Sequence, residues 1–193
     1  LVKNNNNQTT LENEKQGANF FNYIKSNSLT DLTFLEDNIK NTNSSNKLFL
    51  DEFLHGLELK SYNFNKYKSK KENEIYKILI STSTSTFKLT KEKRFISLIE
   101  GIALTKDLVS EPGNILHPDE YSRRLLKLKN DGLKVSVLNT SQLKKLGMNA
   151  LLGVGQGSVR GSYLVVMQWN GTKSTEKPLA FVGKGVCFDT GGI

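Results

Sequence analysis

The sequence predicts an α/β protein, because segments with strand patterning alternate with segments with helical patterning along its 193 residues. Helical spacing of apolar residues is clearest over 47–59 and in the helix that opens at Thr90. Short β-rich runs lie at 32–35, 75–81, 134–138, 162–169 and 178–182. We therefore expect a smaller N-terminal α/β domain over 1–89, a connecting helix over 90–110, and the start of a second α/β domain with a central mixed sheet over 111–193.

The N-terminal domain should contain two helices. Residues 1–9 are Asn-rich and lack patterning, so the first helix is expected from Thr10 as N-cap to about Lys25. The polar residues 41–46 form a linker before the second helix, Lys47 to Leu59. The apolar sides of these two helices are predicted at Phe20, Phe21, Ile24, Leu50, Phe53, Leu54 and Leu57.

The helix that opens at Thr90 carries a long apolar stripe and ends before Pro112. The stripe consists of Phe95, Ile96, Ile99, Ile102, Ala103 and Leu108. Beyond it, Pro118 suits the first turn of a helix that the Asn130–Gly132 turn closes, and Thr140 is the expected cap of a short helix that ends at Gly147. The run 178–182 is expected to be the strand that leads into the last motif of the chain.

Composition restricts the classes of partner. The net charge is +8, from 27 basic and 19 acidic residues, so nucleic-acid binding must be considered. Only four of the basic residues are arginine, and the lysines are scattered apart from a cluster at 66–71, which argues against a nucleic-acid interface. The lone Cys187 allows neither an internal disulfide nor a structural zinc site and fits a reducing cytoplasm. No apolar run is long enough to predict a membrane span.

The most informative pair of residues is Lys184 and Asp189, which follow the run 178–182. A lysine binds a metal only as the neutral amine, and a nearby dication lowers its pKa whereas a carboxylate raises it. The pair therefore fits a cation held between the two side chains. A buried Lys–Asp ion pair explains the same spacing equally well, so both interpretations stay open on the residues alone.

Other motifs are weaker. The run Gly153–Ser158 has the spacing G-x-G-x-G and follows a helix, so it predicts a tight backbone loop rather than a dinucleotide site. Gly183–Gly185 lacks the Ser or Thr of a phosphate-binding loop. Phe188–Gly191 resembles half of an aspartic protease site, but no second copy exists in the chain. His55 and His117 lie far from this motif and are predicted to be structural.

Neither end of the sequence has the features of a natural terminus. Residue 1 is Leu rather than Met, and the last residue, Ile193, directly follows the glycine pair at 191–192. We therefore expect the chain to be an internal fragment of a longer protein.

Four segments resemble the leucyl aminopeptidase (cytosol aminopeptidase) family of two-metal exopeptidases. They are Ser61–Tyr67, Lys106–Asn114 (KDLVSEPGN), Leu146–Ser158 (LGMNALLGVGQGS) and Val182–Gly192 (VGKGVCFDTGG). Their order and spacing match the family over most of 50–193. The sequence departs from the family's usual residues at Lys106, Ser110, Asn149 and Cys187, where Arg, Asn, Gly and Thr or Ile are usual.

The resemblance implies a site and an activity. Lys184 would be a ligand of the exchangeable metal and Asp189 would bridge both metals, which are two divalent ions, Mn²⁺ or Zn²⁺. Residues 111–193 would be the start of the two-metal peptidase catalytic domain. The remaining ligands, a second lysine and an arginine that binds bicarbonate would follow Ile193, so the chain has no catalytic residue of its own and should be inactive alone.

The implied protein is a cytoplasmic homohexamer that releases leucine-like N-terminal residues from peptides. Two alternatives from other classes stay open. One is a truncated or decayed family member without catalysis, and the other is a basic nucleic-acid-binding protein.

Overall fold

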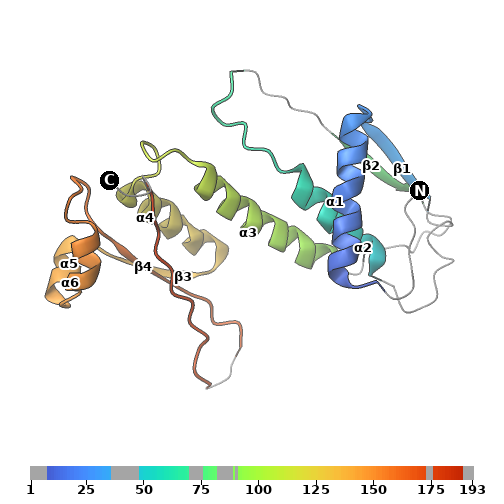
Figure 1. Cartoon of the computed structure of the whole chain (residues 1–193). Coiled ribbons are helices and arrows are strands. Elements are labelled where there is room, and N and C mark those ends of the chain that lie inside the picture. Colours follow the sequence, from blue (N-terminus) through green and yellow to red (C-terminus); the bar gives the residue numbers. More distant parts are fainter. Residues whose placement is uncertain are drawn as a thin grey trace. The chain divides into compact units, whose positions relative to one another are not determined.

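The computed structural model describes residues 8–35, 48–69, 76–81, 89, 91–172 and 176–188 (Figure 1). The chain divides into two compact units, Leu1–Ser110 and Glu111–Ile193. Each unit combines helices with a pair of short strands, which confirms the predicted α/β class. The predicted linker at 41–46 and most of the Ser/Thr-rich stretch after residue 81 lie outside the described residues.

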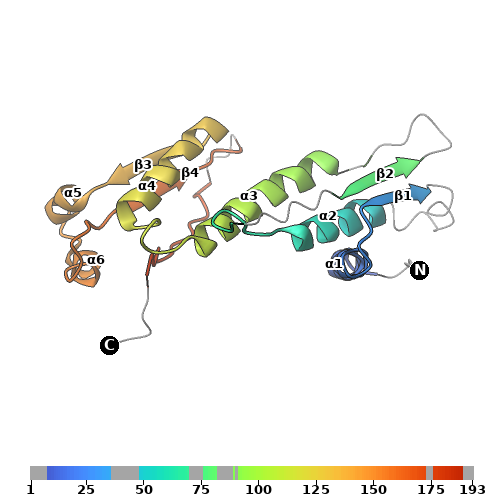
Figure 2. The same cartoon turned by 90° about the horizontal axis from the view of Figure 1, so that it is seen from above.

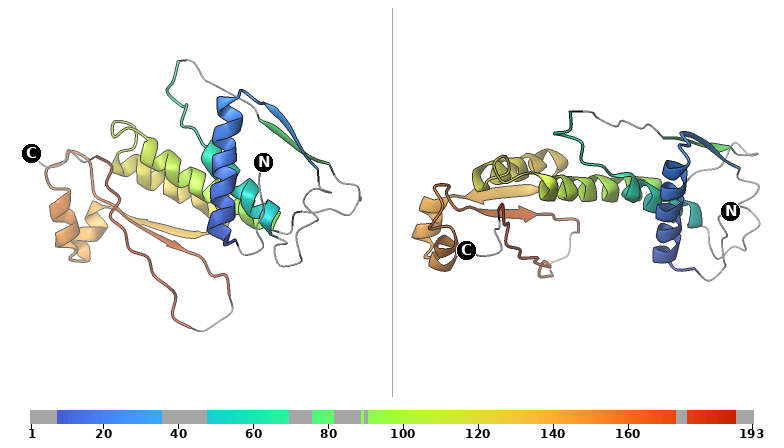
Figure 3. Two further views of the ribbon diagram at one scale, coloured as in Figure 1. Left: turned by 45° about the vertical axis from the view of Figure 1, so that its right-hand side comes forward. Right: turned by 45° about the horizontal axis from the view of Figure 1, so that its top comes forward.

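Two closely packed helices form the centre of the first unit (Figure 3). In α1 (Thr10–Ser26), the cap is Thr9, one residue before the predicted Thr10, because its side chain accepts a hydrogen bond from the backbone N–H of Glu12. The Glu12 carboxylate accepts the Thr9 backbone N–H in return at 2.7 Å. The second helix, α2 (Phe49–Ser61), comes so close to α1 that a Cβ added at Gly17 would overlap the carbonyl oxygen of Phe53.

The core of the first unit is aromatic and aliphatic. Its buried cluster consists of Phe21, Ile24, Phe49, Phe53 and Leu57. The rings of Phe20 and Phe53 pack with their centroids 5.6 Å apart. Burying a side chain of this kind contributes roughly 1.5–3 kcal/mol. The predicted apolar sides of both helices are thus confirmed as the core, although Leu54 is only partly buried.

The strands of the first unit are β1 (Asp31–Leu35) and β2 (Lys77–Ser81), which pair in parallel with Thr33 opposite Leu79 (Figure 2). Parallel neighbours need a long crossover connection, and α2 lies in that connection. Leu32 and Ile78 extend from the strands onto the helical core.

The long helix α3 (Glu92–Ser110) corresponds to the predicted connecting helix, but its apolar stripe is not buried. Ile96 keeps 46% of its surface exposed. The helix is fastened to α2: the Lys106 ammonium donates to the Leu59 carbonyl at 2.9 Å. Beside it, the Tyr62 hydroxyl donates to the Asp107 carboxylate at 2.7 Å. Polar contacts to one neighbouring helix leave much of an amphipathic helix uncovered, which explains the exposed stripe.

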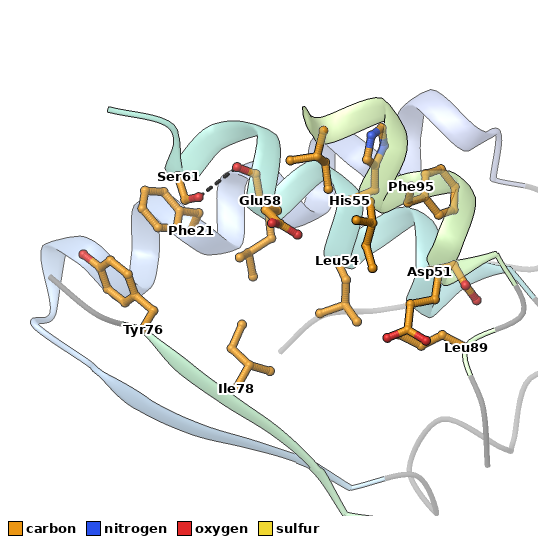
Figure 4. A pocket seen from close by; sticks show the side chains of 14 residues that line it. Phe21, Asp51, Leu54, His55, Glu58, Ser61, Tyr76, Ile78, Leu89 and Phe95 are labelled. Carbon is orange, nitrogen blue, oxygen red and sulfur yellow. Dashed lines mark hydrogen bonds between the residues drawn. The ribbon is translucent and has the colours of Figure 1, made fainter. Parts of the chain in front are cut away.

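A pocket of about 600 Å³ lies in the first unit (Figure 4). Its walls come from α2, β2 and α3, with Leu54, Ile78 and Phe95 among the lining residues. His55 stacks on Phe95 at 4.5 Å between ring centroids, and its Nδ1 lies 2.9 Å from the Glu14 carboxylate. These contacts agree with the structural role predicted for His55. The described residues that line the pocket all belong to the first unit.

The second unit is built around an antiparallel pair of strands, β3 (Lys134–Leu138) and β4 (Leu164–Gln168), with Ser136 opposite Val166. Before the pair come α4 (Pro118–Leu126) and a 3₁₀ helix (Lys127–Asp131), which ends at Gly132 with a left-handed φ of 87°. Between the strands lie α5 (Thr140–Lys145) and α6 (Asn149–Val154). Asn139 caps α5, one residue before the predicted Thr140, because its side chain accepts from the backbone N–H of Gln142.

Candidate metal centre

The segment that leads to the predicted metal residues is not the strand that we expected at 178–182. It forms no strand among the described residues, and Leu179, Phe181 and Val182 are 81%, 90% and 99% exposed. A strand needs a neighbour to take its backbone hydrogen bonds, and none of the described strands pairs with this run. The strand prediction at 178–182 is therefore wrong, because an apolar pattern without a pairing partner does not make a strand.

Lys184 lies in this segment, and its side chain is exposed to solvent. Its ammonium makes no ion pair with any residue that the structure describes. The backbone turns just after it, where the Val186 N–H donates to the Lys184 carbonyl at 3.2 Å. Asp189 lies outside the described residues, so the approach of its carboxylate to Lys184 stays a prediction.

The segment after Lys184 touches two residues near the start of α4. A Cβ built on Gly185 would lie 3.0 Å from Cε1 of the Tyr121 ring. On the other side, a Cβ built on Gly113 would lie 3.2 Å from the Cys187 carbonyl oxygen and equally close to the Phe188 ring. Distances this short leave little room for any side chain larger than hydrogen at either glycine. Gly113 and Tyr121 therefore form a seat for residues 185–188, and we use "seat" for these two residues below.

The turn that carries Gly113 is held by a buried ion pair. The Glu111 side chain is only 1% exposed, and its carboxylate lies 2.8 Å from the Arg124 guanidinium on α4. The Pro112 carbonyl accepts hydrogen bonds from the N–H groups of both Ile115 and Leu116. A buried carboxylate that loses its partner is costly, so this pair fixes the turn against α4.

A second group of charges lies at the N-terminus of α4. His117 is the N-cap residue of the helix, and its Nδ1 lies 3.4 Å from the backbone nitrogen of Glu120. The Asp119 carboxylate lies 2.6 Å from His117 Nδ1 and 3.1 Å from the Arg160 guanidinium. Partial burial by itself would raise the pKa of Asp119. Hydrogen bonds from its own backbone and from His117, with the charges of Arg160 and His117, outweigh that effect and lower it.

Cys187 adjoins this charged group. Burial raises the pKa of its thiol, and the negative charge of Asp119 raises it further. A thiol with a raised pKa is a poor nucleophile and a poor metal ligand at neutral pH. Cys187 is thus a partly buried free cysteine.

The glycine-rich run after α6 is a tight backbone loop, as predicted. A Cβ at Gly155 would overlap the Ser162 hydroxyl, and one at Gly161 would lie 2.9 Å from Thr140 Oγ1. The Thr140 hydroxyl oxygen accepts the backbone N–H of Ser162 at 3.1 Å. These contacts join the start of α5 to the start of β4. Gly155 and Gly161 therefore serve close packing, whereas nothing lies within 4 Å of a Cβ added at Gly153 or Gly157.

The residues present can be tested against a divalent ion. The described residues contain no group of three or more His, Cys, Asp or Glu side chains that could hold one. Lys184 carries an exposed amine, which can bind an ion only in its neutral form. The described part of the chain thus offers one compatible donor, and Asp189 is the candidate for a second.

Sequence reasoning missed both residues of the seat and the ion pair behind it. Titratable residues are the usual sign of a site in a sequence, whereas Gly113 and Tyr121 make steric contacts. Gly113 and Tyr121 lie far from 185–188 in the sequence, so only the folded structure shows that they are neighbours. The available signal was Glu111, a carboxylate beside a Pro-Gly turn, with Arg123 and Arg124 on the next predicted helix as candidate partners.

Comparison with known proteins covers most of the chain. Residues 103–193 match the model of the cytosol aminopeptidase family, catalytic domain. A probable cytosol aminopeptidase of Phytoplasma australiense is 49% identical over 144 residues, which are 73% of this chain and 29% of that protein. One of Bradyrhizobium is 44% identical over 142 residues, 72% of this chain and 28% of that protein. The chain thus spans less than a third of the length of these curated relatives.

Solved structures show the same fold. A mutant of tomato leucine aminopeptidase superposes with a TM-score of 0.81 at 22% identity, over 95% of this chain and 38% of that one. The bottromycin maturation enzyme BotP superposes with a TM-score of 0.65 at 19% identity, over 85% of this chain and 35% of that one. BotP has also been solved in complex with Mn.

In the part of the chain that the structure describes, no helix is both long and apolar enough to cross a membrane. The family-model match and the curated relatives agree with the four segments that carried the resemblance. The chain belongs to the cytosol aminopeptidase family.

Proposed function

We propose that this protein is a metal-dependent aminopeptidase that releases N-terminal residues, preferably leucine-like ones, from peptides. The observation that carries the proposal is the match of residues 103–193 to the family's catalytic domain, because that stretch contains Lys184 and Asp189. Lys184 is exposed to solvent, so an ion can reach its amine.

In this proposal Lys184 and Asp189 hold two divalent ions, Mn²⁺ or Zn²⁺. Such a pair, when bound, acidifies a water molecule and polarises the peptide carbonyl. Lys184 would act as a ligand only as the neutral amine, and a bound dication favours that form. Asp189 supplies a carboxylate, which offers negative charge to both ions.

The 193 residues taken alone are proposed to contribute these ligands without turning over substrate. No residue among them is assigned to the chemical step, and the chain covers under a third of its curated relatives. Bicarbonate as proton relay, a homohexameric assembly and a cytoplasmic location belong to the same proposal, supported by the family and by relatives named cytosol aminopeptidases.

The test compares Lys184→Ala with Lys177→Ala in the intact protein. Both lysines are exposed on the same extended segment, so Lys177→Ala is a matched control. We expect Lys184→Ala to lower kcat/KM for leucyl-p-nitroanilide at least about 100-fold in Mn²⁺, because loss of a ligand costs no less than loss of its supporting groups. The control should keep wild-type activity.

Equal activities in the two variants would contradict the assignment of Lys184. An intact wild-type protein that bound neither Mn²⁺ nor Zn²⁺ and released no p-nitroaniline would favour the non-catalytic alternative. Retention on DNA that falls steeply with salt would favour the nucleic-acid-binding alternative instead.

A further inference from the structure

The metal-bearing segment has few contacts of its own. From residue 177 to residue 186 the chain forms no helix or strand, and its side chains are exposed. Among the described residues, the close neighbours that the structure gives the stretch 185–188 are Gly113 and Tyr121. The position of Lys184 therefore depends on these neighbours.

We propose that Gly113 and Tyr121, the seat defined above, are positioning residues that set the path of residues 184–188 and thereby the place of the Lys184 amine. The inference rests on the proposed function for the role of Lys184, but the contacts themselves do not. Tyr121 acts through the edge of its ring at Gly185, and Gly113 acts by leaving room for the Cys187 carbonyl and the Phe188 ring.

The seat can fix the path of residues 184–188 because both of its residues are attached to α4. Tyr121 lies in the first turn of α4, where its N–H donates to the His117 carbonyl at 2.8 Å. Gly113 follows Glu111, whose buried carboxylate is bound to Arg124 on the same helix. Both halves of the seat are thus attached to α4, so they cannot move independently. A ligand held by a rigid neighbour loses less freedom when it binds a metal.

The atoms in contact make a specific prediction. The Tyr121 atoms nearest to a Cβ at Gly185 are ring carbons, Cε1 at 3.0 Å and Cδ1 at 3.6 Å. The hydroxyl is not required, so Tyr121→Phe should behave as wild type and Tyr121→Ala should release the segment. Gly113→Val is the second variant, because its extra atoms would displace the Cys187 carbonyl from the other side.

The experiment follows two quantities in the intact protein. The first is amide hydrogen exchange of 185–188 in metal-free protein, which should be at least about tenfold faster in Tyr121→Ala and Gly113→Val. The second is Mn²⁺ affinity by calorimetry, which should fall about 10-fold in both variants, as for other residues that orient ligands. Tyr121→Phe should match wild type, as should Tyr23→Ala, a control at an exposed tyrosine in the first unit.

The outcomes separate this inference from the proposed function. If Tyr121→Ala and Gly113→Val both kept the exchange rates and the Mn²⁺ affinity of the wild type, the positioning role of the seat would be wrong. This would hold even if the protein is an active aminopeptidase. Faster exchange at 185–188 in these variants, together with a wild-type protein that lacks peptidase activity, would support the positioning role of the seat. The same result would contradict the proposed aminopeptidase function. Equal losses in Tyr121→Phe and Tyr121→Ala would show that the hydroxyl, and not the ring contact, acts, and would overturn the mechanism proposed here.

Discussion

The two units differ in how much apolar surface they bury. The first unit packs α1 against α2 through buried Phe21, Ile24, Phe49, Leu50, Phe53 and Leu57. Among the described residues of the second unit, the buried apolar side chains are Leu116, Val135 and Leu143. Both units also bury polar groups: the Asn13 amide donates to the Glu52 carboxylate in the first, and Glu111 pairs with Arg124 in the second. With a smaller described apolar core, the unit that carries the candidate site depends more on its ion pair.

The largest effect is expected where the two helices of the first unit touch. An Ala methyl at Gly17 would overlap the backbone of Phe53, so Gly17→Ala should destabilise the first unit by about 3 kcal/mol. Gly101→Ala is the matched control, because nothing lies within 4 Å of the added Cβ in α3. It should be neutral or stabilise by about 0.5–1 kcal/mol. Urea unfolding measures both, and equal stabilities would contradict the close helix contact.

A smaller loss is expected from the buried ion pair of the second unit. Glu111→Gln leaves Arg124 with only Glu120 as a partner. We expect about 2 kcal/mol of destabilisation, less than for a fully buried pair because Arg124 is 21% exposed. Glu100→Gln on the exposed side of α3 should stay within about 0.5 kcal/mol of wild type. Thermal unfolding compares the two, and a Glu111→Gln variant as stable as Glu100→Gln would show that the pair does not hold the turn.

The smallest effect is a pH dependence at α4. Hydrogen bonds from Arg123 and Arg124 lower the pKa of Glu120 from 4.5 to about 2. Because the folded-state pKa is below the unfolded one, this carboxylate stabilises the fold above pH 4.5, and its contribution is lost as the pH falls toward 2. Unfolding free energies at several pH values should therefore fall more steeply for wild type than for Glu120→Gln over this range. Parallel curves would argue against the pairing of Glu120 with the two arginines.

The same comparison shows what a sequence can reveal. Elements that depend on the residue pattern within one segment were predicted closely. β3 has the predicted bounds Lys134–Leu138, and the apolar sides of α1 and α2 form the core. Caps were missed by one residue at Thr9 and Asn139, because neighbouring Thr side chains have the same capping chemistry. Features that need a distant partner were not predicted: the run 178–182 has no pairing strand, and the seat joins residues far apart in the chain.

The assignment of Lys184 and Asp189 as metal ligands stays a prediction, because it rests on residue type and on the family resemblance. Lys184 was identified from its position in the motif and from the family resemblance, and the structure shows its side chain exposed. The neighbours proposed to position it, Gly113 and Tyr121, are a glycine and an aromatic residue. Neither residue type by itself indicates a functional site in a sequence. Its pairing with Asp189 stays a prediction.

The most direct test of the account is whether the intact protein removes a single residue from a free N-terminus. A leucine-initiated tripeptide and its N-acetylated form would be incubated with the protein and Mn²⁺, and the products would be measured by mass spectrometry. The account predicts release of leucine from the free peptide only, loss of that release with a chelator, and its recovery when Mn²⁺ is added back. Cleavage of both peptides, or of neither, would contradict the assignment as a metal-dependent aminopeptidase.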